Sequence, residues 1–247
     1  MTTKPSFLAS LCVASMLSLG SLAFGEVIFQ KDFTLPGETT QSDLSGMRFW
    51  SGAPVNTWGE ILIEPLPSGV VDSPKKALSV FTNSTNPQAP DGSRFAPSIV
   101  IKTPGFGAGG QTKTAVYSLR FLIPIDQKYR ADIHFGGSWD SNATILMLGS
   151  NNLKALIRGT PTSVGEYVAN VWQELRVEFD CENKSYSIFL NGKTLAEGLP
   201  WNNPKLSSIE SLGIFPGEMP VDQDRTAVFY IEKIEISGKQ VSETTKP

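Results

Sequence analysis

The chain has 247 residues, and its 21 Lys and Arg against 24 Asp and Glu give a formal net charge of −3. Binding along nucleic-acid phosphates needs a strongly basic surface, so this balance excludes nucleic acid from the expected partners. Hydrophobic residues make up 40% and charged residues 18% of the chain, a composition that can bury a core and is not that of a disordered protein.

The first 25 residues have the pattern of a secretory signal peptide. Lys4 gives a positive start, residues 7–22 are uncharged and mostly apolar, and Ala23-Phe24-Gly25 offers small residues for cleavage. No later stretch reaches the length of a membrane span. We therefore expect cleavage near Gly25 and a secreted, periplasmic or extracellular product with no transmembrane segment in the mature chain.

Cysteine usage indicates how the exported chain is held together. Removal of the leader takes Cys12 away and leaves Cys181 alone, so no intramolecular disulfide is expected. No cysteine-protease signature surrounds Cys181, which we expect to be a small buried residue on an apolar strand face. The remainder is expected to be one domain over residues 26–237, followed by a polar tail over 238–247.

The predicted elements are strands. No window keeps the helical i, i+3, i+4, i+7 spacing for three turns, and only a short turn near 205–207 is expected to be helical. Segments 36–59, 83–97 and 105–110 are rich in turn-forming residues and are expected to be surface loops. The strands expected in chain order are 27–29, 31–33, 61–63, 77–81, 98–101, 116–123, 133–135, 144–149, 153–158, 175–181, 186–190 and 228–236.

Residues 168–199 carry the clearest pattern in the chain. Apolar residues at 175, 177, 179 and 181 alternate with polar residues at 176, 178 and 180, and a second alternating run over 186–190 ends at Asn191-Gly192. Side chains of a strand alternate between its two faces, so this pattern predicts a hairpin in an antiparallel sheet with one buried and one solvated face.

This hairpin resembles the concanavalin A-like lectins and glucanases and the laminin-G-like jelly rolls. The residues that carry the resemblance are Trp172, Leu175, Val177, Phe179, Asp180, Tyr186, Ile188, Leu190, Asn191 and Gly192, with the apolar run 228–236 similar to the closing strand of bacterial members. It is sharpest over residues 170–236. The resemblance implies a single all-β domain, a two-sheet antiparallel β-sandwich of jelly-roll type. That superfamily holds lectins, hydrolases, lyases and interaction modules, so the fold leaves the function open.

Two enzyme alternatives follow from the resemblance. Glu178, Asp180 and Glu182 are similar to the Glu-x-Asp-x-Glu signature of laminarinases and lichenases, in which two carboxylates about 5–5.5 Å apart act as nucleophile and acid/base. Against this, Glu182 falls where a turn should begin, and Asp180 is suited to shaping that turn. The second alternative is a polysaccharide lyase, because Asp132-Ile133-His134 faintly resembles the Gln-Ile-His strand of alginate lyases.

Aromatic residues beside polar ones favour a binding function. A Trp face stacks on the C–H face of a sugar, while amides, carboxylates and guanidinium groups bind its hydroxyls. The candidate ligand-binding residues are Trp139, Asp140, Arg158, His134 and Trp201, with Trp50 and Trp58 beside a long loop. We expect Trp139 and Asp140, which directly follow the His134 strand, to lie at the centre of the site.

We therefore expect an exported, non-catalytic carbohydrate-binding or interaction module whose partner is a polysaccharide or another glycan. No organic cofactor is expected. Calcium stays open, since superfamily members often bind it in oxygen-rich loops, and segments 140–142 and 222–224 are candidates. Sequons begin at Asn83, Asn142 and Asn183, and their use depends on the host.

Overall fold

The computed structural model describes residues 26–34, 47–50, 59–66, 76–82, 98–107, 112–123, 131–136, 141–215 and 226–240. The expected signal peptide lies outside these residues and stays a prediction. Every regular element of the described residues is a strand, which confirms the all-β class. The strands are β1 (Glu26–Asp32), β2 (Met47–Trp50), β3 (Gly59–Pro65), β4 (Lys76–Thr82), β5 (Ser98–Phe106), β6 (Thr112–Leu122), β7 (Ala131–Gly136), β8 (Asn142–Gly149), β9 (Asn152–Ile157), β10 (Thr160–Glu166), β11 (Gln173–Asp180), β12 (Ser185–Leu190), β13 (Lys193–Pro200), β14 (Ile209–Phe215) and β15 (Thr226–Gln240).

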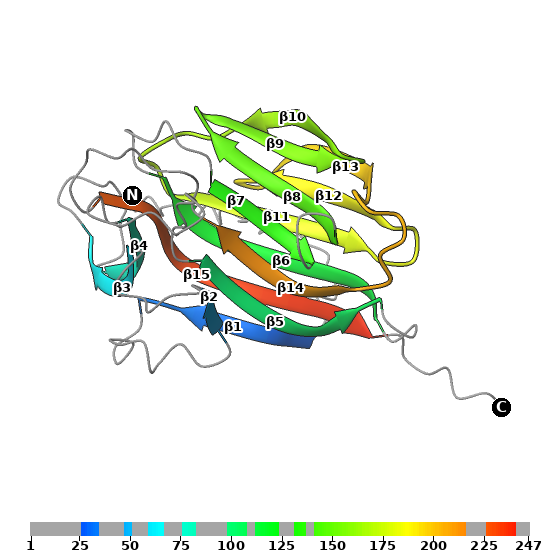
Figure 1. Ribbon diagram of the computed structural model, residues 1–247, viewed down its shortest axis with the longest axis horizontal. Helices are drawn as coiled ribbons and strands as arrows, with labels where there is room; N and C mark the ends of the chain where they lie inside the picture. The colour runs from blue at the N-terminus through cyan, green and yellow to red at the C-terminus, as the bar shows by residue number, and fades with distance from the viewer. Residues whose placement is uncertain are drawn as a thin grey trace, which may run out of the picture.

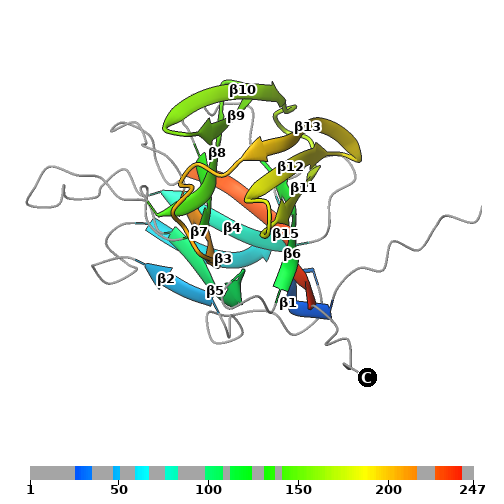
Figure 2. The same cartoon turned by 90° about the vertical axis from the view of Figure 1, so that its right-hand side faces the viewer.

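The strands form two antiparallel sheets packed as a jelly-roll sandwich (Figure 1). The eight-stranded sheet has the order β13-β12-β11-β6-β15-β4-β3, and β1 pairs with the second half of β15. The seven-stranded sheet has the order β10-β9-β8-β7-β14-β5-β2. Figure 1 shows that β14, which comes late in the sequence, lies between the earlier strands β7 and β5 of the seven-stranded sheet. The edge strands β10 and β13 meet at one end of the sandwich (Figure 2).

The core lies between the two sheets and is built from the apolar side of each alternation. Tyr117 of β6 stands at its centre, with ring centroids of Phe106, Phe135 and Phe179 5.2–5.9 Å away in edge-on arrangements. Aromatic pairs in this geometry contribute beyond their buried area. The predicted face of β11 is confirmed, since Leu175, Val177, Phe179 and Cys181 are all buried.

Tight turns set the register of three hairpins. Ser150 and Asn151 join β8 to β9, Arg158 and Gly159 join β9 to β10, and Asn191 and Gly192 join β12 to β13. All six residues have φ between 48° and 81°. Two consecutive positive φ values define the type I′ turn, whose twist matches that of paired strands. The hairpin predicted at 150–152 is therefore confirmed, and the antiparallel pairing of β11 with β12 confirms the one predicted over 175–190.

Several segments differ from the sequence-based expectation. Strand β2 lies inside the expected loop 36–59, and β10, β13 and β14 were not among the expected strands. Phe106 belongs to β5 and is buried in the core, so the segment 105–110 begins inside a strand and not in a loop. Strand β15 continues to Gln240, past Gly238, where we expected the tail to begin. Residues 205 and 206 lie in a hydrogen-bonded turn, in which the Leu206 N–H donates to the Asn203 carbonyl, and the segment 205–207 is not helical.

Candidate functional site

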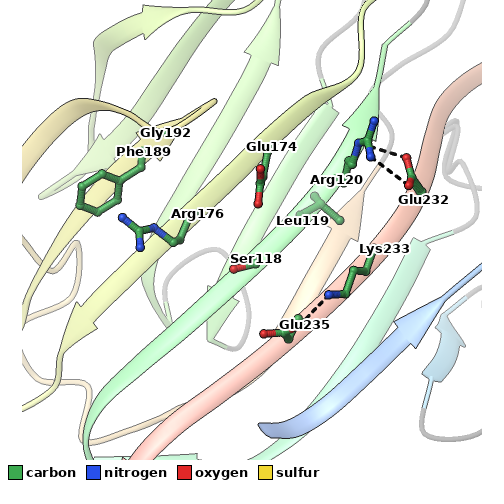
Figure 3. Close-up of a pocket in the computed structure, with 10 residues that line it drawn as sticks. All are labelled: Ser118, Leu119, Arg120, Glu174, Arg176, Phe189, Gly192, Glu232, Lys233 and Glu235. Carbon is green, nitrogen blue, oxygen red and sulfur yellow. Dashed lines mark hydrogen bonds and ion pairs between the residues drawn. The ribbon is translucent and has the colours of Figure 1, made fainter. Parts of the chain in front are cut away.

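A groove of about 610 Å³ crosses the outer face of the eight-stranded sheet, the face that points away from the core (Figure 3). It extends over β6, β11, β12 and β15 and the turn after β12. The residues that line it are Ser118, Leu119, Arg120, Glu174, Arg176, Phe189, Gly192, Glu232, Lys233 and Glu235. Most of them carry polar or charged side chains, unlike the opposite face of the same strands.

Strand alternation and register gather these side chains. In β11 the buried Leu175 and Val177 leave Glu174 and Arg176 on the outer face, and in β6 the outer residues are Ser118 and Arg120. Cross-strand pairing then sets their neighbours. Arg120 of β6 lies opposite Glu174 of β11 and Lys233 of β15, and Ser118 of β6 lies opposite Arg176 of β11 and Glu235 of β15. Directly opposite Cβ atoms are about 4.5–5.5 Å apart, so the groove consists of two adjacent rows of interacting side chains.

A β-bulge in β15 adds one carboxylate to the groove. Ile231 pairs with Phe121 and Lys233 pairs with Arg120, so Glu232 is an extra residue between two paired positions. Ile231 and Ile234 are both buried in the core, which leaves Glu232 and Lys233 together on the outer side. Bulges re-aim side chains in this way. Without the bulge, two consecutive residues of a strand would face opposite sides of the sheet.

Glu232 and Arg120 form a bidentate ion pair within the groove. Arg120 Nη1 donates to Glu232 Oε1 at 3.1 Å, and Nε lies 3.0 Å from Oε2. The Arg120 guanidinium also lies 5.8 Å from the ring centroid of Trp172, in cation–π contact. Burial raises the pKa of the Glu232 carboxyl, and Arg120 counteracts this rise while the nearby Asp32 charge adds to it. Two partners therefore hold the Arg120 side chain in one orientation.

The second row is organised around Arg176. Its guanidinium lies 4.2 Å from the Phe189 ring centroid, and Nη1 is 3.1 Å from Glu178 Oε1. At the other end of this row Glu235 Oε2 lies 2.8 Å from Nζ of Lys233, which belongs to the first row. Figure 3 shows Arg176 extended toward Phe189 and both ion pairs of β15. Each cation of the groove thus has a carboxylate partner, and in the described part of the chain the Glu174 carboxylate has no ion-pair partner.

The turn after β12 forms one wall and is fastened to β11. Asn191 donates its N–H to the Glu174 carbonyl, and its Oδ1 accepts from the Glu174 N–H, both at 2.8 Å. Its Nδ2 donates to Gln173 Oε1 at 2.8 Å. Gly192 follows with φ 76°, a conformation that L side chains rarely adopt. These bonds fix the backbone that carries Glu174.

Apolar residues close one end of the groove. Ala77, Leu122, Trp172 and Tyr230 form a buried cluster on the same outer face, beyond Arg120. Trp172 is 8% exposed and packs within this cluster. The groove therefore has an apolar end, two rows of fixed donors and acceptors, and the Phe189 ring.

The groove can bind a polyhydroxylated molecule. Guanidinium and ammonium groups donate to hydroxyl oxygens, carboxylates accept from hydroxyl hydrogens, and an aromatic ring with its guanidinium neighbour offers a flat surface for C–H groups. A small number of fixed polar groups around a concave surface is the general composition of a ligand site.

The three carboxylates of the hydrolase alternative do not share one arrangement. Glu178 faces outward on β11 and pairs with Arg176, whereas Glu182 lies in the turn after β11, where it is exposed and 3.3 Å from Lys113 Nζ. Asp180 shapes that turn, because its Oδ1 accepts from the N–H groups of Glu182 and Asn183 and its Oδ2 accepts from Asn183 Nδ2. This is the hairpin role that the sequence also allowed, and Glu182 does leave the strand face.

The remaining predicted residues are scattered. Trp201 is 1% exposed in the core and donates its indole N–H to the Ser185 carbonyl, so the interpretation of its ring as a surface platform for sugars is corrected. His134 of β7 is buried on the outer face of the other sheet, with its ring 4.3 Å from that of Phe215. Arg158 is exposed at the β9–β10 turn. Trp139 and Asp140 lie outside the described residues, as does Trp58.

Metal and modification sites are likewise constrained. Within the described ranges no group of three His, Cys, Asp or Glu could hold a metal ion. Asn142 is fully buried, and its Oδ1 accepts from Asn202 Nδ2. Asp140 lies outside the described residues, so calcium binding at 140–142 stays a prediction. Asn183 is exposed, while Asn83 and the segment 222–224 are outside the described residues. The described part of the chain has no helix with the length and apolar character that crossing a membrane requires.

Sequence reasoning placed Arg176 and Glu178 on a solvated face but did not identify the groove. The available signal was the same period-two alternation in β6, where Ser118 and Arg120 separate buried apolar residues. The bulge at Glu232 carries no such signal, because its extra residue is defined only by pairing with β6.

Comparisons with known proteins give a fold and no family. No protein-family model and no curated protein matches the chain. Among solved structures, a sialidase matches 90% of this chain with a TM-score of 0.59 at 14% identity, and the match spans 19% of that longer chain. A GH131 β-glucanase catalytic domain from Podospora anserina matches at 14% identity over 88% of this chain and 98% of its own, with a TM-score of 0.59. The catalytic domain of a glycoside hydrolase family 131 protein from Coprinopsis cinerea matches at 15% identity over 90% and 100%, with a TM-score of 0.57. The chain therefore shares a jelly-roll sandwich fold with these proteins, and the fold alone assigns no function.

Proposed function

We propose that this protein is an exported, non-catalytic carbohydrate-binding module and that its ligand lies in the groove on the eight-stranded sheet. The observation that carries the proposal is the groove itself, in which Arg120, Arg176 and Lys233 are each held by a carboxylate. Fixed donors and acceptors bind hydroxyls without first having to be ordered, which lowers the cost of binding. Three of the structural neighbours are a sialidase and two glycoside hydrolase domains, which supports a carbohydrate ligand.

The test compares two arginines on the two sheets. We expect Arg176→Ala to weaken glycan binding about 5- to 150-fold, which corresponds to losing one anchor of about 1–3 kcal/mol. Arg158→Ala is the matched control, because it removes the same side chain from the exposed β9–β10 turn. Calorimetric titration with glycans first identified on an array measures both. If Arg158→Ala weakens binding and Arg176→Ala does not, the ligand lies on the other surface and the groove is rejected.

A glycoside hydrolase is the second candidate. It is favoured by the two GH131 catalytic domains, which the chain matches over 98–100% of their length, so a domain of this size can be catalytic. The two candidates differ in one measurement. A module binds the glycan and releases no new reducing ends on prolonged incubation, whereas a hydrolase releases them in proportion to enzyme concentration.

A further inference from the structure

The charges on the outer face of the eight-stranded sheet bear on the kind of glycan that the groove accepts. The groove and the adjacent position on β11 hold three cations, Arg120, Arg176 and Lys233. They also hold four carboxylates, those of Glu174, Glu178, Glu232 and Glu235. Three positive and four negative charges leave a local net charge of −1. A surface that binds an acidic polymer instead needs an excess of cations.

The pairing of these charges matters as much as their number. Arg120 Nη1 donates to Glu232 and its Nε lies 3.0 Å from the other carboxylate oxygen, Arg176 pairs with Glu178 and stacks on Phe189, and Lys233 pairs with Glu235. An incoming uronate or sulfate group would have to displace a carboxylate from each cation that it contacts. It would also approach Glu174, which is exposed and has no ion-pair partner in the described residues. Hydroxyl groups face neither cost, because they accept from the cations and donate to the carboxylates at once.

We infer that the groove selects uncharged polysaccharides and excludes polyuronates and sulfated glycans, with Glu174 and Glu235 as the residues that determine this selection. The inference rests on the proposed function and adds a ligand class to it. Glu174 acts by repulsion at an open position. Glu235 acts through its ion pair with Lys233, which leaves Lys233 less available to an acidic ligand. Glu235 itself lies opposite Ser118 in the pairing of β15 with β6. Specificity that arises from unfavourable contacts with the wrong ligand is a general device of binding sites.

The experiment uses affinity electrophoresis of the full mature chain in gels that contain one soluble polymer each. The neutral polymers are a β-glucan, a galactomannan and an arabinoxylan, and the acidic ones are alginate and polygalacturonate. The variant Glu174→Gln/Glu235→Gln keeps the side-chain shapes and changes the local charge from −1 to +1. The control Glu166→Gln/Glu210→Gln makes the same change in total charge on β10 and β14 of the other sheet.

We expect the wild type to be retarded by at least one neutral polymer and by neither acidic one. The groove variant should gain affinity for polyuronates by about fivefold for each carboxylate removed, from the interaction of two charges about 4 Å apart in water, and high salt should abolish this gain. The control variant should gain nothing.

The outcomes separate this inference from the proposed function. Wild-type binding to polyuronate that Arg176→Ala weakens would overturn the neutral selection and leave the groove as the binding site. A groove variant that still ignores polyuronates would also overturn the inference, because the charges would then not determine selection. Wild-type binding to no polymer of either kind would reject both.

Discussion

Trp201 offers a direct test of the boundary between core and site. Its side chain is 1% exposed and packs in the main core cluster, and its indole N–H donates to the Ser185 carbonyl at 3.3 Å. A buried Trp removes about 200 Å² from water, which at about 25 cal/mol per Å² stabilises the fold by about 5 kcal/mol at most. The long hydrogen bond adds about 1 kcal/mol or less.

We therefore expect Trp201→Ala to lower the free energy of unfolding by about 3–5 kcal/mol. Trp201→Phe keeps most of the ring volume and should lose about 1–2 kcal/mol, since only the smaller cavity and the indole N–H bond are affected. Urea denaturation followed by circular dichroism measures both changes. Glycan titration at a temperature where both variants are folded should show unchanged affinity. A Trp201→Ala protein of wild-type stability with lost affinity would refute the core assignment and return this ring to the ligand site.

Three further predictions follow from other residues. Asp180→Ala removes the acceptor of three hydrogen bonds in the β11–β12 turn and should destabilise the domain by about 1–3 kcal/mol, as measured by urea denaturation. Burial raises the pKa of Asp180, but these bonds and the Lys113 charge outweigh burial and lower the pKa overall. The stability that the ionised carboxylate supplies is therefore present at pH 7 and is lost as the pH falls below about 4. A stability advantage of the wild type over Asp180→Asn that persists unchanged at pH 2–3 would contradict this. Burial, with a further contribution from the Asp180 charge, raises the pKa of Cys181 to about 12, so a thiol reagent at pH 8 should label it only in denaturant, and fast labelling of the native protein would place it at the surface. Expression in a glycosylating host should leave Asn142 unmodified because its side chain is fully buried, and a glycopeptide at Asn142 in folded protein would contradict the structure.

Much of the fold could be predicted from local alternation. The β11–β12 hairpin has apolar residues at every second position, and Asp180 shapes its turn through its own side chain. Asn191 joins the end of β12 to the start of β11 through bonds to Glu174 and Gln173, so the local sequence of the hairpin contains the groups that its structure requires. Strand β14 lacks this signal, because it lies between β7 and β5 and is buried over most of its length. Its Gly213 allows the Phe215 ring to lie over the backbone, where a Cβ would come within 2.4 Å of Cε2. This contact between Gly213 and the Phe215 ring cannot be predicted from the sequence alone.

The candidate site was harder to predict than the fold. A Trp beside polar loop residues is the sequence pattern expected of a sugar site, and Trp201 has this pattern although it is a core residue. The groove is instead built from three parts of the chain that are distant in sequence, namely β6, the β11–β12 hairpin and β15, and residues from these parts become neighbours only through strand register. Arg120 and Glu232 are 112 positions apart in the chain, and no local pattern around either one indicates the other.

The bulge at Glu232 makes this position of β15 more tolerant of a residue's insertion or deletion than the neighbouring positions are. Inward residues occupy odd positions before Glu232, as at Phe229 and Ile231, and even positions after it, as at Ile234 and Ile236. Deleting Glu232 would restore one-to-one pairing and keep every other side chain on its present side, whereas deleting a neighbouring residue outside the bulge would turn the rest of the strand inside out. In the part of β15 that follows Phe229, natural insertions and deletions should therefore concentrate at Glu232, where a single residue can be gained or lost with the groove altered and the inward side chains kept in place.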